Sequence, residues 1–108
     1  MKRVKLGIVT MTLSGPSGEI EKQVQVGDML RAWVRQPDAS GIRDFEDMES
    51  RLCVIRKLRA ADAAGAEHVD FEDAEHAVLL RAVLAAPKPH ADEAFLDVMR
   101  RVRDAPPA

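Results

Sequence analysis

A turn followed by strict alternation is the feature that most constrains the fold of this chain. Residues 19–26, EIEKQVQV, place Ile20, Val24 and Val26 on one side and mostly charged or amide side chains on the other. Alternation with a period of two is typical of a strand with one buried and one wet face. The preceding SGPSG has proline and glycine where turns favour them, and VKLGIVTMTL before it is rich in strand-forming residues. The sequence therefore predicts an N-terminal β-hairpin over about residues 4–26.

The same glycine-rich turn has a second interpretation, a loop that binds phosphate. Such a loop needs the spacing G-x-x-x-x-G-K-[ST] between a strand and a helix. Here Gly15 and Gly18 are too close, no lysine follows Gly18, and Glu19 would repel a phosphate. The hairpin interpretation is therefore favoured.

The first strand of the predicted hairpin changes phase. Its apolar positions are first Val4, Leu6 and Ile8, and then Val9, Met11 and Leu13. A bulge near Gly7 would reconcile the two halves. Further along the chain, residues 67–69 form a short connector, which could cover one edge of the hairpin as a third strand.

The rest of the chain predicts helices over about residues 28–36, 43–64, 70–86 and 91–104, because apolar residues recur there at helical spacing. We expect Asp28 to cap the first helix, and Asp70 to cap the third with Asp73 three positions later, as in a capping box. The expected apolar stripe of the second helix is Phe45, Met48, Leu52, Ile55 and Leu58 or Arg59. That of the third is Phe71, Ala74, Val78, Leu79, Ala82 and Val83, widened by Leu80 and Leu84. That of the fourth is Phe95, Val98, Met99 and Val102. The third helix is expected to be the most buried, and the PPA tail to fray. The predicted fold is α+β, a hairpin packed on a bundle of three to four helices, in a single domain over residues 1–108.

Composition excludes several classes of function. Sixteen basic residues against eighteen acidic ones leave no overall basic character, so nucleic-acid binding is not favoured. Aromatic residues are few, and Trp33 is expected in the core rather than at a stacking platform. A lone cysteine, Cys53, indicates no disulfide framework and a reducing cytosol. No apolar run reaches the length of about 18 residues that spans a bilayer, and no signal peptide is expected.

Neither a catalytic centre nor a metal site is predicted. Glu72 and His76 lie four apart on one helix face and His68 could approach them, which is adequate chemistry for zinc. However, the sequence has no H-E-x-x-H motif and no pair of cysteines. Cys53 is interpreted as a small core residue rather than a nucleophile, and no G-x-S-x-G element is present. We therefore expect no catalytic residue, no cofactor and no metal, and a protein that is not an enzyme.

Charge patterning has a structural interpretation and a functional alternative. In the three longer helices acidic residues come early and basic residues late, as the helix dipole favours. The alternative is that the Arg-rich helix ends, above all Arg100, Arg101 and Arg103, contact an acidic partner or nucleic acid.

Two stretches carry a resemblance to known proteins. VGDMLRAWV and VDFEDAEHAVLLRAVL resemble segments of small, mostly uncharacterised proteins of tailed bacteriophages and prophages; the matching positions are Val26, Gly27, Leu30, Val69, Phe71, Glu72 and Leu79 to Leu84. The N-terminal half is also similar to tail assembly chaperones of contractile-tailed phages, whose hairpin ends in a GDL-like step, here residues 27–30 with Met29 inserted. These families carry no catalytic residues. The resemblance implies a non-enzymatic phage or prophage protein that binds a phage or host protein, in virion or tail assembly, within the bacterial host cytosol or the virion.

The second strand of the hairpin is the candidate contact surface. Glu21, Gln23 and Gln25 keep its outer face soluble while its backbone stays available to a strand from a partner or a second copy. The alternative for this edge is that it is only solvated. For the whole protein, the alternative functions are a small nucleic-acid-binding regulator and, last, a small metal-dependent enzyme.

Overall fold

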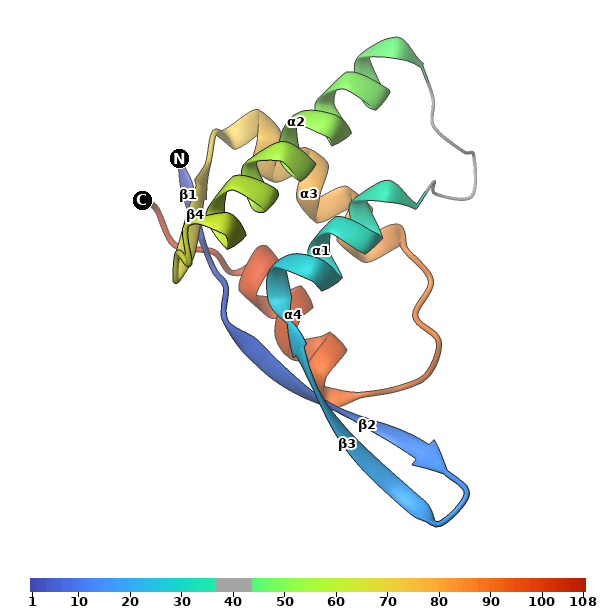
Figure 1. The fold of residues 1–108 in the computed structure, drawn as a ribbon. Helices are drawn as coiled ribbons and strands as arrows, with labels where there is room; N and C mark the ends of the chain where they lie inside the picture. Colours follow the sequence, from blue (N-terminus) through green and yellow to red (C-terminus); the bar gives the residue numbers. More distant parts are fainter. Residues whose placement is uncertain (37–43) are drawn as a thin grey trace.

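The computed structural model describes residues 1–36 and 44–108, which form paired strands beside a group of packed helices (Figure 1). In chain order the elements are β1 (Lys2–Lys5), β2 (Ile8–Gly15), β3 (Gly18–Gln25), α1 (Val26–Arg35), α2 (Phe45–Ala63), β4 (His68–Phe71), α3 (Asp73–Ala85) and α4 (Glu93–Arg103). This architecture confirms the predicted α+β class with an N-terminal hairpin. The segment between the first two predicted helices, and the start of the second at residue 43, lie outside the described residues.

The N-terminal apolar run forms two strands, because the chain turns at Gly7. Gly7 has a φ of +109°, a conformation that glycine adopts far more readily than other residues. On either side of it Leu6 and Val9 are buried whereas Ile8 is exposed. The predicted change of phase is therefore confirmed, and it takes the form of a break between β1 and β2.

The third strand predicted near residue 67 is found, but its predicted partner is wrong. β4 pairs antiparallel with β1, with Val4 opposite Val69, and not with the hairpin. The reason is burial, because Val4, Val69 and Phe71 all bury their side chains in the core in this arrangement. Arg3 and Asp70, which face each other across the pair, add an ion pair with an Nε–Oδ1 distance of 2.8 Å.

The C-terminal tail is also not frayed as expected. The backbone N–H of Arg3 donates to the carbonyl oxygen of Pro106 (N–O distance 2.8 Å), and Lys2 and Pro107 form an antiparallel bridge. The tail thereby covers the edge of β1 that β4 leaves open, where unpaired backbone groups favour an added partner.

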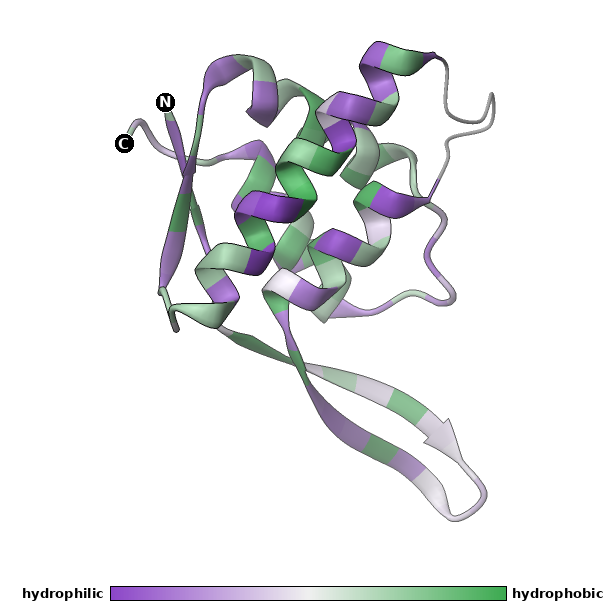
Figure 2. Cartoon of the chain, turned by 45° about the horizontal axis from the view of Figure 1, so that its top comes forward, coloured by the Kyte–Doolittle hydropathy of each residue, from purple (hydrophilic) through white to green (hydrophobic). Residues whose placement is uncertain are grey.

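The core lies between the helices and the β1–β4 pair. Figure 2 shows many hydrophobic segments along the packed helices. Trp33 of α1 is buried as predicted and meets Phe95 of α4 edge-on, with ring centroids 6.0 Å apart. α3 contributes Leu79, Ala82 and Val83, which are buried, whereas Ala74 and Leu84 from its predicted stripe are exposed. The stripe of α4 is buried except at Met99, which is half-buried.

Two predicted helix caps are wrong. α1 begins at Val26, so Asp28 lies in its first turn and pairs with Arg31. Asp70 is held in β4 by Arg3, so α3 starts after Glu72, whose backbone N–H donates to Glu75 (N–Oε1 distance 2.8 Å). The capping box therefore exists two residues later than expected.

The predicted stripe of α2 divides between two faces. Val54, Ile55 and Leu58 are buried, but Phe45, Met48 and Leu52 have 79%, 47% and 39% of their surface exposed. Cys53 is exposed too, so its interpretation as a core residue is wrong. The physical reason is that α2 lies at the border of the molecule, where α1 and α3 pack against one side of it only (Figure 1).

Some charges assigned to helix dipoles are instead part of the packing. Arg51 is buried, and its Nη1 donates to the carbonyl oxygens of Val34 and Gln36 at 2.9 and 3.0 Å, which satisfies the C-terminal end of α1. Asp47, also buried, pairs with Arg51 and with Arg81 of α3. The last turns of α2 and α3 carry no basic residue, so among the three longer helices the dipole explanation holds at that end only for α4.

Candidate functional site

The β2–β3 hairpin is an arm that projects away from the helices (Figure 1). Its strands pair in register from Ile8 opposite Gln25 to Gly15 opposite Gly18, with Pro16 and Ser17 as the turn. Burial decreases along the arm, from the helices toward the tip. Val9 is buried and Met11 and Val24 are half-buried, while Ile20 near the tip is exposed.

The register decides which backbone groups of β3 point outward. The N–H of Val26 donates to the carbonyl oxygen of Gly7 (N–O distance 2.9 Å), which marks the pair at the base of the arm as hydrogen-bonded. Hydrogen-bonded and non-bonded pairs alternate along an antiparallel ladder. Gln25, Gln23 and Glu21 therefore occupy non-bonded positions, and their N–H and C=O groups point away from β2.

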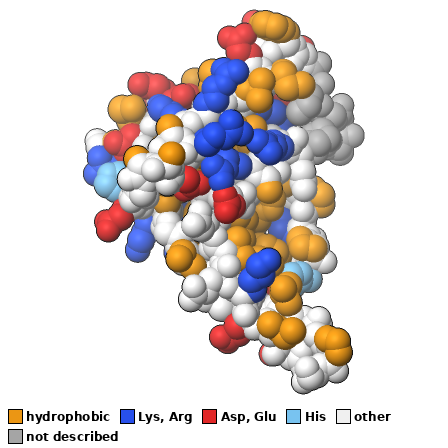
Figure 3. Space-filling model, in the orientation of Figure 1, with side chains coloured by type: hydrophobic (Ala, Val, Ile, Leu, Met, Phe, Trp, Pro, Cys, Tyr) orange, Lys and Arg blue, Asp and Glu red, His pale blue; other side chains and the backbone are white. Residues whose placement is uncertain are grey.

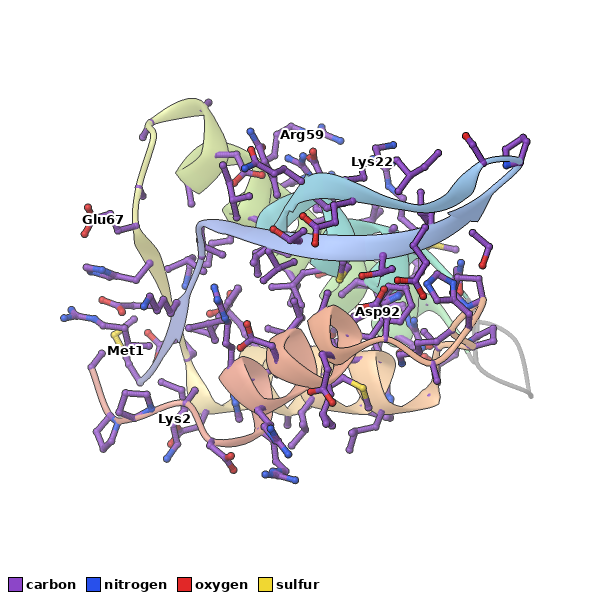
Figure 4. All side chains as sticks on the ribbon, turned by 90° about the horizontal axis from the view of Figure 1, so that it is seen from below. Met1, Lys2, Lys22, Arg59, Glu67 and Asp92 are labelled. Atoms are coloured by element: carbon purple, nitrogen blue, oxygen red, sulfur yellow. The ribbon has the colours of Figure 1, made fainter. Side chains whose placement is uncertain are left out.

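The outer edge of β2 is held by the N-terminal end of α4. The N–H of Thr12 donates to Oδ2 of Asp92 at 3.0 Å, and Oδ1 of the same side chain accepts from the N–H of Ala94 at 2.9 Å. These two backbone donors, first Ala94 and then Thr12, hold the pKa of Asp92 below its ordinary value. Asp92 thus caps α4 and ties the arm to it at once. Figure 4 shows Asp92 on the α4 side of the hairpin and Lys22 on the other.

The outer edge of β3 has no such contact. Among the described residues β3 pairs with β2 alone, and every residue of β3 except Val24 is exposed. Glu21, Gln23 and Gln25 are therefore exposed in the structure, beside a row of outward backbone groups. The two edges of one hairpin differ in that one is anchored and the other is open.

A hollow of about 680 Å³ lies between β2 and the segment before α4. His90 and Asp92 line it, with Nε2 of His90 at 3.2 Å from Oδ2 of Asp92. Both oxygens of this carboxylate already accept backbone hydrogen bonds, as described above. The hollow is thus the space beside a structural contact between the arm and α4.

The arginines of α4 do not join the candidate residues of β3 in one site. Arg101 pairs with Asp97, and its Nη1 donates to the carbonyl oxygen of Leu6 at 2.9 Å, so it anchors α4 to the start of the arm. Arg103 pairs with Asp104 at 2.8 Å (Nε–Oδ1), which raises the pKa of the arginine, while Arg100 is exposed. All three lie at the end of α4 opposite to Asp92.

The residues considered for zinc are kept apart by their other contacts. Nε2 of His76 lies 2.7 Å from the carbonyl oxygen of Val102, and His68 is exposed on β4. Within residues 1–36 and 44–108 no group of three His, Cys, Asp or Glu side chains is placed to hold a metal ion.

Comparison of the chain with protein-family models, with curated proteins and with solved structures gives no match. In the part of the chain that the structure describes, no helix has the length and apolar character needed to cross a membrane.

Proposed function

We propose that this chain acts without catalysis, as a protein-binding domain whose partner adds a strand to the outer edge of β3. The observation that carries the proposal is the difference between the two edges of the arm. β2 is tied to Asp92, whereas the outward backbone groups of β3 face solvent along the strand. An exposed edge of this kind is a template for pairing with an extended segment of another chain.

The side chains of β3 favour a selective contact. Glu19 and Glu21 discourage indiscriminate pairing, because an added strand must carry basic or neutral residues opposite them. Ile20 offers one exposed apolar contact near the tip. A partner strand would thus gain backbone hydrogen bonds along β3 and specificity from a few side chains.

We place this activity in a phage or prophage context, as a component or helper of virion or tail assembly. The support is the resemblance of the step at residues 27–30, where the hairpin joins α1, to that of tail assembly chaperones. The nucleic-acid alternative has less support, because Arg101 and Arg103 are engaged with Asp97 and Asp104.

The test removes one outward donor without changing the backbone. Gln25 has a φ of −75°, which proline adopts without strain. We expect Gln25→Pro to fold as the wild type does and to lose affinity for the partner, whereas Gln25→Ala, which shortens the same side chain but keeps the N–H, retains it. The partner is first identified with a photocrosslinking residue at Gln23, and the Kd values are then measured on purified proteins by calorimetry.

Circular dichroism establishes that each variant is folded before binding is compared. If folded Gln25→Pro binds the crosslinked partner with the Kd of Gln25→Ala, the donor at this position is not used and the edge proposal is wrong.

A further inference from the structure

A second surface, on α2, carries an inference that goes beyond the arm. Phe45, Met48 and Leu52 follow one another at successive turns on the side of α2 that faces away from α1 and α3, and all three are exposed. In Figure 3 hydrophobic side chains gather at the top of the visible face, and Lys and Arg side chains gather below them over α1 and α2. We call Phe45, Met48 and Leu52 the outer stripe.

Charges of opposite sign lie beside the outer stripe. Glu49, which also borders a hollow shared with α3, precedes Leu52, and Arg56 and Arg59 follow one and two turns after it. All three charged residues are exposed, and none has an ion pair with another described residue. By contrast, the charges on the inner side of α2 are matched, since Asp47 pairs with Arg81 and Lys57 with Glu75. Glu49, Arg56 and Arg59 are thus left without an opposite charge among the described residues.

We propose that the occupant of the outer stripe is a second copy of this chain, bound through an antiparallel α2–α2 contact with Leu52 at the two-fold axis. In this arrangement Leu52 meets its own copy. Glu49 lies beside Arg56 of the other copy, because the two positions are nearly equidistant from Leu52 along the helix. Phe45 and Arg59 are each seven residues from Leu52, or about 10 Å at 1.5 Å per residue. The ring of one copy therefore meets the guanidinium of the other, a favourable cation–π geometry.

The sign of the charges selects this orientation. A two-fold axis perpendicular to a pair of antiparallel helices brings the same flank of each helix together, so Glu49 and Arg56 meet twice in one interface. A parallel pair would bring opposite flanks together and keep Glu49 of one copy about 10 Å along the axis from Arg56 of the other, so neither charge would meet its opposite. The outer face of α2 is therefore complementary to itself in the antiparallel orientation only, as an isologous interface requires.

The interface is small, because it rests on one helix from each copy. Contacts at the low end of the range for specific complexes, below about 1,200 Å², are typical of weak association. We therefore expect a reversible dimer with a Kd in the micromolar range, which populates at high local concentration.

The first experiment measures mass against concentration by sedimentation velocity across the micromolar range. The wild type is expected to shift from monomer to dimer, and Leu52→Asp to weaken this association by at least about tenfold, because it buries a charge at the axis. Leu96→Asp is the matched control, since Leu96 on α4 is also 39% exposed but lies outside the outer stripe. It is expected to dimerise as the wild type does.

The second experiment uses charge exchange to test the antiparallel register. Glu49→Arg and Arg56→Glu are each expected to be monomeric, because each creates two like-charge contacts. A mixture of the two is expected to form a one-to-one heterodimer, in which both contacts become attractive. A third variant, Leu52→Cys with Cys53→Ser, is expected to form an intermolecular disulfide under mild oxidation, since position 52 meets its own copy.

A wild type that stays monomeric throughout the concentration range overturns the proposal, as does a dimer that survives Leu52→Asp. A dimer lost in both charge variants but not restored by mixing them also overturns it, because the register would then be wrong. These outcomes are independent of the edge proposal, since Gln25→Pro leaves the outer stripe intact and Leu52→Asp leaves the arm intact.

Discussion

The two strand pairs of this molecule differ in how deeply their side chains are buried and in whether their outer edges are covered. β1 and β4 are four residues long each, yet Val4 and Phe71 are fully buried and the C-terminal tail closes the free edge of β1. β2 and β3 are twice as long, but only Val9 is buried in them and the outer edge of β3 is open within the described residues. The short pair belongs to the core, while the long pair provides surface.

This contrast shows that strand length is a poor guide to a strand's share of stability. An isolated two-stranded hairpin is marginal in water, and packing against other elements is what stabilises it. The arm has this packing only near the helices and at Asp92. We therefore expect the same type of substitution to lower the free energy of unfolding strongly in the β1–β4 pair and only slightly toward the tip of the arm.

The largest effect is expected for Phe71→Ala in β4. Phe71 is fully buried, so the substitution should lower the free energy of unfolding by about 3–5 kcal/mol, through lost burial and a remaining cavity. Phe45→Ala is the matched control, and its effect on a dilute, monomeric sample should stay within about 0.5 kcal/mol. Denaturant titration followed by circular dichroism measures both. Equal losses of unfolding free energy would show that Phe45 is buried in the monomer, and it would then not be part of an exposed outer stripe.

The next effect concerns Gly7, where the chain passes from one pair to the other. An alanine side chain there meets no atom within 4 Å, so the cost is that of holding φ at +109°, about 1–3 kcal/mol. Gly18→Ala, at a φ of +120° and equally free of contacts, imposes the same strain at the turn of the arm. The arm can relieve it locally, so we expect a smaller change in the denaturant midpoint. Identical midpoints would mean that the arm unfolds together with the core.

The hairpin and the helices could be predicted from the sequence because period and turn chemistry are local properties. The partner of β4 could not, since Val69 fits against β1 or against the hairpin equally well by pattern, and the burial of Val4 and Phe71 decides between them. The sequence also could not predict which apolar residues of α2 are buried and which are exposed. These residues are spaced as one broad stripe, and only the positions of α1 and α3 leave Phe45 and Leu52 outside.

Of the candidate site, the exposed face of β3 could be predicted from the sequence, but the contacts that anchor the arm could not. The alternation of β3 places Glu21, Gln23 and Gln25 on one face, which the structure confirms as exposed. The role of Asp92 was missed. Its place before an apolar helix is a capping signal, but its contact with Thr12 joins residues 80 positions apart, and no local pattern encodes that distance. The contact of Arg101 with the carbonyl oxygen of Leu6 is likewise beyond any local pattern, because the two residues are 95 positions apart.

Acidification should weaken the anchored edge of the arm. The charged form of Asp92 accepts the N–H groups of Ala94 and Thr12, so its pKa is lower in the folded than in the unfolded protein. Its contribution to stability is therefore complete above the unfolded pKa of about 4 and is lost as the pH falls through the lower folded value. Asp92→Ala should lower the melting temperature most at neutral pH, and the difference from the wild type should shrink below about pH 4. Glu93→Gln, at the neighbouring exposed position, is the control.

Amide exchange of Thr12 provides a direct measurement of the same contact. We expect its protection to fall in Asp92→Ala at neutral pH, while the amide of Val69 between β1 and β4 stays protected. If both amides lose protection together, Asp92 stabilises the whole fold and does not selectively hold the arm.

The smallest effect on stability is expected at Ile20. A substitution there distinguishes a contribution to folding from a contribution to partner binding. Ile20 is half exposed near the tip, so Ile20→Thr keeps a β-branched strand former and should change the free energy of unfolding by less than about 0.5 kcal/mol. If a partner strand lies on the outer edge of β3, however, the lost apolar contact should weaken the binding of the crosslinked partner. Calorimetric Kd values and denaturant midpoints measured on the same samples test both statements. An unchanged free energy of unfolding with a raised Kd would show that Ile20 contacts the partner. If neither quantity changes, the tip of the arm is only solvated.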